Sequence, residues 1–172
     1  IGDRAHIEAY GALVKGGTGA VTLSGVNSYS GGTFLEQGRL TLAGTNLLYS
    51  AYGVWITDGV LDLGASVHAV SGLDLSAGTV ETGTLSVSGS INLASGSVRA
   101  NLTGGARLTK NSAGTVVLSA TTDYTGGTDV QAGLLQLLGT NVLSSAGVLQ
   151  VTGGSLDLGG TLQTAGAVTL QS

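Results

Sequence analysis

Hydrophobic and polar residues alternate along this chain in short segments, most of which begin with a glycine. Each segment reads glycine, any residue, an apolar residue, a polar or small residue, and a second apolar residue. Examples are GAVTL at 19–23, GRLTL at 38–42 and GVLDL at 59–63. Alternation over five residues predicts a β-strand with one buried face. In the third example, Leu61 and Leu63 are predicted to face a core and Asp62 to face solvent.

The spacing of the glycines predicts how these strands are connected. Glycines that begin strands lie five to seven residues apart, at 72, 78, 83, 89 and 96 and again at 147, 154, 160 and 166. Three such steps make about 17–20 residues, which is typical of one coil of a parallel β-solenoid. The longest glycine-free stretch, 115–125, is rich in β-branched residues, which disfavour a helix. We therefore predict an all-β chain that folds as a β-solenoid with glycine-rich turns.

One local signal favours a different arrangement. Asp58-Gly59 lies between two strand-like segments and is a strong β-hairpin sequence, and Gly153-Gly154 occupies the matching place further along the chain. An antiparallel meander or sandwich is therefore an open alternative. We prefer the solenoid because a sandwich normally has longer strands and more varied loops than these short, even steps indicate.

A long internal duplication organises the chain. Residues 13–75 align without a gap to residues 108–170, an offset of 95 residues, with 26 identities among the 63 pairs. Such a match indicates duplicated architecture, here about four to five coils long. We interpret residues 1–172 as one solenoid segment that contains two related repeats.

Composition narrows the class of protein. Hydrophobic residues make up 42% of the chain, too many for a disordered chain, and 31 of 172 residues are glycine without any proline, which excludes collagen. The net charge of −4 and the six scattered basic residues argue against a nucleic-acid partner. No apolar run reaches the roughly 18 residues of a membrane-spanning helix. The first residue is isoleucine and no signal sequence follows it, so we expect a piece of a longer protein.

Tyrosine, glycine, threonine and asparagine recur at the turns of both repeats. The matched residues are Tyr29, Gly31, Gly32, Thr33 and Asn46 in the first repeat and Tyr124, Gly126, Gly127, Thr128 and Asn141 in the second. The asparagines close Gly-Thr-Asn turns, where asparagine tolerates the left-handed conformation. We expect the glycine pairs to let the backbone reverse or approach a neighbouring coil. A phosphate-binding loop is disfavoured, because neither pair is followed by a helix N-terminus or a lysine.

The duplicated segments also carry a family resemblance. In the second copy its residues are Leu108-Thr109-Lys110, Gly114–Ser119, Tyr124–Thr128, Gly133 and Leu135, and in the first copy Lys15, Gly19–Ser24, Tyr29–Thr33, Gly38 and Leu40. This pattern resembles the passenger-associated transport repeat of bacterial autotransporters, in copies at about 13–48 and 108–143. Departures from the pattern are Ala120 in place of Gly25 and Thr122-Asp123 in place of Asn27-Ser28.

The resemblance implies a right-handed parallel β-helix, displayed at or released from the surface of a Gram-negative bacterium by type V secretion. It also implies that the repeats assist folding and export, with a C-terminal translocator barrel outside this sequence as a partner. We therefore expect a structural passenger segment. The first alternative is an adhesin segment that binds a host-surface or homotypic protein or glycan ligand. Open ends of a solenoid can pair edge to edge, so self-association through the coil ends is also expected.

The sequence contains no pattern of titratable residues that favours catalysis. A glycan-active β-helix is the second alternative, and it needs two carboxylates close together. Asp58 and Asp62 are four residues apart, and Asp123 and Asp129 flank a glycine turn, but scattered surface acids explain both pairs more simply. The two histidines have no zinc-binding partner in the sequence. We predict no enzyme activity, no cofactor and no metal.

An aromatic cluster, Tyr49, Tyr52 and Trp55, is a candidate binding site. The second repeat has Ser144, Gly147 and Gln150 at these positions, so the coil itself does not require the rings. Tyrosine and tryptophan commonly anchor interfaces and pack on sugar faces, which favours an interaction role. The alternative is that the rings fill a wider part of the core or cap one end.

Overall fold

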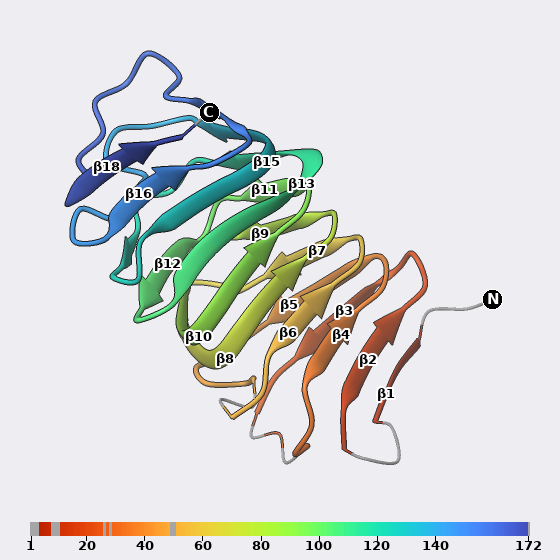
Figure 1. Ribbon diagram of the computed structural model, residues 1–172. Helices are drawn as coiled ribbons and strands as arrows, with labels where there is room; N and C mark the ends of the chain where they lie inside the picture. Colours follow the sequence, from red (N-terminus) through yellow and green to blue (C-terminus); the bar gives the residue numbers. More distant parts are fainter. Residues whose placement is uncertain (1–3, 8–10, 26, 28, 49–50, 172) are drawn as a thin grey trace.

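The computed structural model describes residues 4–7, 11–25, 27, 29–48 and 51–171, and it is a parallel β-solenoid (Figure 1). Successive coils are stacked along one axis, with the two termini at opposite ends of the stack. Among the described residues, every strand pairing is parallel except β1 with β2. The predicted all-β solenoid is thereby confirmed.

Most strands have two to four residues, whereas β8, β10, β13 and β15 have 9, 10, 12 and 10 residues. Their bounds are β1 (Arg4–Ile7), β2 (Leu13–Gly16), β3 (Ala20–Leu23), β4 (Thr33–Leu35), β5 (Arg39–Leu42), β6 (Val54–Ile56), β7 (Val60–Asp62), β8 (Val67–Leu75), β9 (Thr79–Glu81), β10 (Thr84–Leu93), β11 (Gly96–Val98), β12 (Asn101–Gly104), β13 (Arg107–Leu118), β14 (Asp123–Tyr124), β15 (Thr128–Leu137), β16 (Val148–Val151), β17 (Ser155–Asp157) and β18 (Ala167–Leu170).

The coil length varies from 17 to 21 residues, as seen where Asn101 pairs with Thr84 and where Val54 pairs with Thr33. Despite this variation, the duplication has a simple structural meaning. Five successive pairings lead from Leu13 through positions 33, 54, 73 and 91 to Leu108. The offset of 95 residues is therefore five coils.

The hairpin alternative is wrong. Asp58-Gly59 lies between β6 and β7, but these strands do not pair with each other: β6 pairs with β4 and β8, and β7 pairs with β5 and β9. Gly59 has a φ of 93°, and a Cβ there would lie 2.4 Å from the carbonyl oxygen of Gly38 in the preceding coil. The glycine is needed because two coils approach closely at this corner, and the same need explains why the sequence looks like a hairpin turn.

Inward-facing aliphatic side chains form a continuous core. One inward row runs through Leu40, Leu61, Val80, Val98 and Leu118, all at most 1% exposed, on the strands from β5 to β13. Each side chain packs on its neighbours one coil above and below, and full burial stabilises by about 1.5–3 kcal/mol per large aliphatic residue. Stacking of coils therefore supplies the stability.

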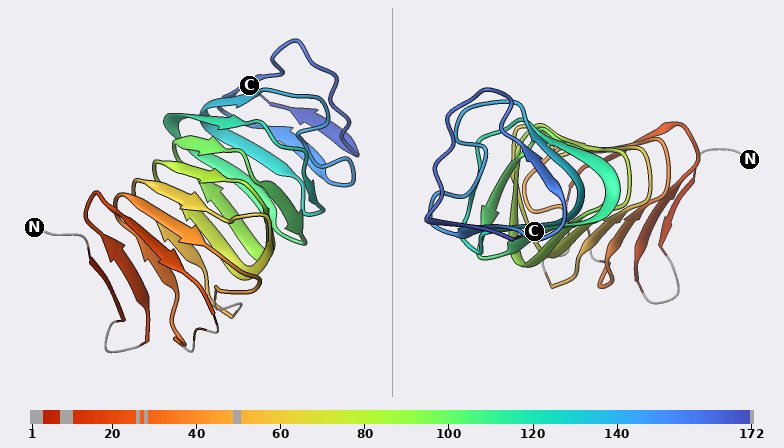
Figure 2. Two further views of the ribbon diagram at one scale, coloured as in Figure 1. Left: turned by 180° about the vertical axis from the view of Figure 1, so that it is seen from behind. Right: turned by 45° about the horizontal axis from the view of Figure 1, so that its top comes forward.

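The third side of the solenoid differs along its length. In the middle coils it carries regular strands, where Val67–Val70 of β8 pairs with the start of β10 and β10 pairs with β12. In the two repeats, irregular connections take this place: the described residues among 24–32 and 43–53 in the first, and residues 138–147 in the second. These connections join the strands of the stacked coils, which Figure 2 shows from two further sides. Five of the repeated turn residues lie in them: Tyr29, Gly31, Gly32, Asn46 and Asn141.

Candidate functional site

A buried lysine stands at the same place in both repeats. Lys15 and Lys110 are fully buried, in an inward row otherwise occupied by aliphatic residues such as Leu35 and Leu93. The ammonium group of Lys15 donates to the carbonyl oxygens of Gly16 (2.9 Å) and Gly17 (2.8 Å) and, in the next coil, Gln37 (3.1 Å). The lysine thus ties a turn to the coil that follows it.

Lys110 makes the equivalent contacts in the second repeat. Its ammonium group donates to the carbonyl oxygen of Ser112 and to that of Ala132 in the next coil, the latter at 3.0 Å. Desolvation lowers the pKa of Lys110 below its ordinary value. Both copies of the motif therefore use the lysine to satisfy backbone carbonyls across a coil boundary, because buried carbonyl groups are costly to leave unpaired.

The tyrosine and threonine of each Tyr-x-Gly-Gly-Thr turn pair inside the core. The hydroxyls of Tyr29 and Thr33 are 2.9 Å apart, and those of Tyr124 and Thr128 are 2.6 Å apart. Burial raises the pKa of the Tyr124 hydroxyl. These residues join the aliphatic core, so their polar atoms bond to each other and to nearby backbone rather than to solvent.

The glycines of these turns lie against neighbouring coils. A Cβ at Gly31 would lie 2.8 Å from the backbone nitrogen of Ala12, and one at Gly126 would lie 2.4 Å from the carbonyl oxygen of Ala106. Gly32 is covered by the indole of Trp55, whose Cζ3 would lie 2.2 Å from an added Cβ. A Cβ at Gly127 would lie 2.5 Å from a backbone oxygen. The turn glycines therefore give space to the next coil.

The aromatic cluster is only partly assembled as an exposed patch. Tyr49 lies outside the described residues, and Tyr52 is 50% exposed. Trp55 on β6 is half-buried and stacks on Phe34 of β4, with ring centroids 4.7 Å apart and planes 10° from parallel. Stacked aromatic neighbours on adjacent strands stabilise a sheet, so Trp55 has a structural role besides any binding role.

Different chemistry occupies the aromatic position in the second repeat. Asp129 stands at the position of Phe34 and Gln150 at that of Trp55. Arg107 on β13 reaches both, with its guanidinium 3.9 Å from the Asp129 carboxylate and hydrogen-bonded to the Gln150 side chain. The equivalent outward positions therefore make a ring-stacking contact in the first repeat and polar contacts in the second.

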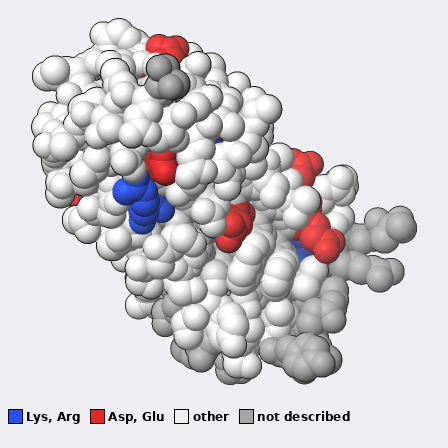
Figure 3. Space-filling model, in the orientation of Figure 1, with Lys and Arg blue, Asp and Glu red and all other residues white. Residues whose placement is uncertain are grey.

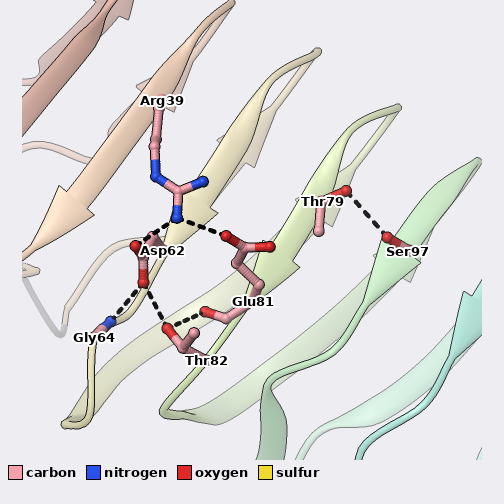
Figure 4. A network of polar contacts seen from close by, with 7 residues as sticks. All are labelled: Arg39, Asp62, Gly64, Thr79, Glu81, Thr82 and Ser97. Carbon is pink, nitrogen blue, oxygen red and sulfur yellow. Dashed lines mark hydrogen bonds and ion pairs between the residues drawn. The ribbon is translucent and has the colours of Figure 1, made fainter.

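Two carboxylates come together around Arg39 on β5 (Figure 4). The guanidinium is 2.6 Å from both Asp62 on β7 and Glu81 on β9. A hydrogen bond from Thr82, backed by the Gly64 amide and by Arg39, holds the pKa of Asp62 below its ordinary value. Asp62 faces outward as predicted, but it is part of an ion-pair network, and a carboxyl that is ionised in this way is unsuited to act as a general acid at neutral pH.

The buried imidazole of His68 was not singled out by the sequence pattern. Its Nδ1 accepts a hydrogen bond from the Leu47 amide at 3.3 Å, and its Nε2 is 3.1 Å from the carbonyl oxygen of Leu63. Desolvation lowers its pKa from the ordinary 6.5. In the second repeat Gln163 stands at this position, and its Oε1 accepts from the Val142 amide at 2.8 Å. The duplication alone could have revealed this equivalence, since both residue pairs are 95 positions apart.

Charged groups on the visible surface are few, and most of that face is uncharged (Figure 3). Within the described ranges, no group of three or more histidine, cysteine or acidic side chains is placed to hold a metal ion. In the same part of the chain no helix is long and apolar enough to cross a membrane. Charged residues make up 9% of the chain.

The last coil exposes part of the apolar core. A cavity of about 390 Å³ at this end is lined mainly by aliphatic side chains, among them Leu149, Val151 and Leu156. Leu162 and Leu170 are 73% and 74% exposed. Self-association through the coil ends stays a prediction, which the sedimentation behaviour of the chain at increasing concentration would test.

Comparison with known proteins identifies both repeated segments. The passenger-associated transport repeat family matches residues 13–42 and 108–137. The chain is also similar to the Adhesin BmaC autotransporter of Brucella suis biovar 1 (strain 1330), with 29% identity over 136 residues. The match covers 78% of this chain and 4% of that relative. No solved structure matches the chain.

Proposed function

From the premise that this chain is a segment of an autotransporter passenger domain, at the surface of or secreted by a Gram-negative bacterium, we propose that it is a rigid stalk whose two repeats promote folding. A passenger domain is linked to a C-terminal translocator domain, which we propose as the partner of the longer protein. The chain spans a small part of the relative that it matches, so these roles concern this segment.

The buried lysines carry this proposal. Each repeat places a cation in a core row that is otherwise aliphatic, and each cation bonds to carbonyls in two successive coils. Desolvating a charge is expensive, and well-packed hydrophobic replacements are often neutral or stabilising. A lysine kept twice at this cost fits a role in setting which coil follows which, because only the correct register brings both sets of carbonyls to one ammonium group.

Refolding of the chain after dilution from urea tests this role. Lys15→Leu and Lys110→Leu give these positions the aliphatic residue found at Leu35 and Leu93 in the same row. We expect each variant to refold several-fold more slowly and the double variant to refold more slowly still, whatever the change in stability. Leu93→Met is the matched control for a core substitution without a cation. Unchanged refolding rates in all variants would refute the proposal.

A second candidate function is adhesion through the aromatic cluster. The observation that favours it is the exposure of Tyr52 and Phe34, 50% and 37%, beside the half-buried Trp55. The test replaces Tyr49, Tyr52 and Trp55 with the serine, glycine and glutamine of the second repeat and measures binding of the chain to cultured host cells. A folded variant that binds as well as the original chain would remove this function.

We also propose that the segment is not an enzyme. The two carboxylates that meet at one cation, Asp62 and Glu81, are both ion-paired with Arg39, and the lowered pKa of Asp62 opposes proton donation. The test is incubation of the chain with a panel of bacterial and host polysaccharides. Release of new reducing ends, abolished by Asp62→Asn, would overturn this view.

A further inference from the structure

Both repeats form an open notch at the same corner of the solenoid, lined by both polar and apolar atoms. The first, of about 460 Å³, is lined by Gly25, Asn27, Gly44, Thr45, Asn46 and Leu47. The second, of about 360 Å³, is lined by Thr121, Thr122, Asp123, Asn141, Leu143, Ser145 and Thr164. Asn27 corresponds to Thr122 and Asn46 to Asn141 under the offset of 95 residues. A notch that returns after five coils, although most of its lining residues differ, follows from the repeat architecture.

Hydrogen bonds between coils fix the shape of the notches. Asn46 and Asn141 have φ of 50° and 54°. Their backbone N–H groups donate to the carbonyl oxygens of Val67 (3.3 Å) and Leu162 (3.0 Å) in the following coil. In the second notch, the Thr164 hydroxyl donates to the Asn141 side-chain oxygen at 3.2 Å. The site is therefore held before any ligand arrives, which reduces the entropy cost of binding.

The second notch is also tied from its other side. The hydroxyl of Thr122 donates to the carbonyl oxygen of Val142 at 2.7 Å, so the loop after β13 is joined to the loop after β15. Together with Thr164, the lining draws on three consecutive coils. Side chains that come from several fixed coils are held at constant separations, as specific recognition of a small ligand requires.

The lining groups indicate the class of ligand. They are hydroxyls, amides and backbone groups beside one leucine, Leu47 or Leu143, and among the described residues no basic side chain lines either notch. Asp123, in the lining of the second notch, is charged and exposed. Such a surface offers donors and acceptors to a ligand rich in hydroxyls, a small apolar contact to its carbon face, and nothing to neutralise an anion. The volumes suit one or two sugar rings.

We propose that the two notches are binding sites for neutral saccharides. This proposal concerns other residues than those of the aromatic cluster, and it does not depend on the role of the repeats in folding. The second notch is the stronger site, because the carboxylate of Asp123 adds a charge-assisted hydrogen bond to a sugar hydroxyl.

Nuclear magnetic resonance of the isotopically labelled chain tests this inference. The probes are D-glucose, D-galactose and N-acetyl-D-glucosamine, with N-acetylneuraminic acid as the anionic comparison. At least one neutral sugar is expected to shift the amide signals of residues 121–123 and 141–145 in a saturable way. The anionic sugar is expected to bind at least several-fold more weakly because of Asp123.

Variants separate the site from the fold. Asn141→Gly removes the side-chain amide, and glycine tolerates the positive φ at this position. Asp123→Ala removes the carboxylate. Each is expected to weaken binding at the second notch about tenfold, the loss of one good hydrogen bond. Asn111→Ala, at an exposed position on β13, is the control and leaves binding unchanged. No saturable shift with any neutral sugar, shifts centred elsewhere, or tighter binding of the anionic sugar would each overturn the proposal.

Discussion

The stability of this solenoid is expected to fall as the pH drops below about 6.5, because of His68. The imidazole is fully buried, its Nδ1 accepts the Leu47 amide hydrogen, and its Nε2 carries the proton that it donates to the carbonyl oxygen of Leu63. Protonation of Nδ1 would place two donors against each other. Only the neutral ring fits the folded chain well.

The sign follows from proton linkage. Burial lowers the pKa of His68 in the folded state below its ordinary value of 6.5, which we take for the unfolded state. Above that value both states hold the ring neutral, and the stabilisation is fully present. As pH falls below it, the unfolded chain binds a proton that the folded chain does not, and stability decreases until the folded pKa is reached. The loss is at most about 1.4 kcal/mol for each pH unit in this window.

Urea denaturation followed by circular dichroism measures this loss, with His68→Gln as the matched variant. Glutamine is the natural residue at the equivalent position of the second repeat, where Gln163 accepts the Val142 amide hydrogen at 2.8 Å. The variant keeps an acceptor for Leu47 but cannot titrate. We expect the difference in unfolding free energy between the two proteins to change in favour of the glutamine variant as pH falls through 6.5.

Amide hydrogen exchange provides a local measurement within one molecule. The protection factor of the Leu47 amide, bonded to His68, is expected to fall with acid relative to that of the Val142 amide, bonded to Gln163. If the original chain and His68→Gln lose stability in parallel, or if both amides keep a constant ratio of protection, the histidine is not the titrating group and the reasoning is wrong.

Four further substitutions, one of them a control, test individual contacts by urea denaturation. Gly59→Ala is expected to lower the free energy of unfolding by about 2–4 kcal/mol, because the added Cβ would lie 2.4 Å from a backbone oxygen. Gly160→Ala has open space around it and is expected to cost only about 1–2 kcal/mol, for its positive φ alone. Equal losses in the two variants would contradict the argument that two coils approach closely at Gly59. Tyr124→Phe is expected to cost about 1–2 kcal/mol of stability, because the buried hydroxyl of Thr128 loses its 2.6 Å hydrogen bond to Tyr124. An unchanged stability would show that this pair is dispensable. Arg39→Met should cost less than about 1 kcal/mol and lose that effect in high salt, because the guanidinium is 40% exposed; a larger, salt-independent loss would refute a surface ion pair.

The sequence by itself predicted most of the architecture, because alternation, glycine spacing and duplication can all be read along the chain. Strict alternation fixed which face of a strand such as 59–63 is buried, and even glycine steps fixed the coil. The duplication fixed the repeated turns, so the positive φ of Asn46 and Asn141 agrees with what the Gly-Thr-Asn turns require. These features need no knowledge of which coils are neighbours.

Only the tertiary structure decided what each side chain contacts, because coils of 17 to 21 residues bring together residues whose separation in sequence is not constant. The register of the coils lets buried Lys15 donate to a carbonyl oxygen in the next coil. It also brings Arg39 to acids one and two coils away, and the imidazole of His68 to the backbone amide of Leu47. It also separated the strands flanking Asp58-Gly59, which the local sequence would have paired as a hairpin. Contacts across coils depend on the accumulated length of each turn, and no single segment of the chain contains that information.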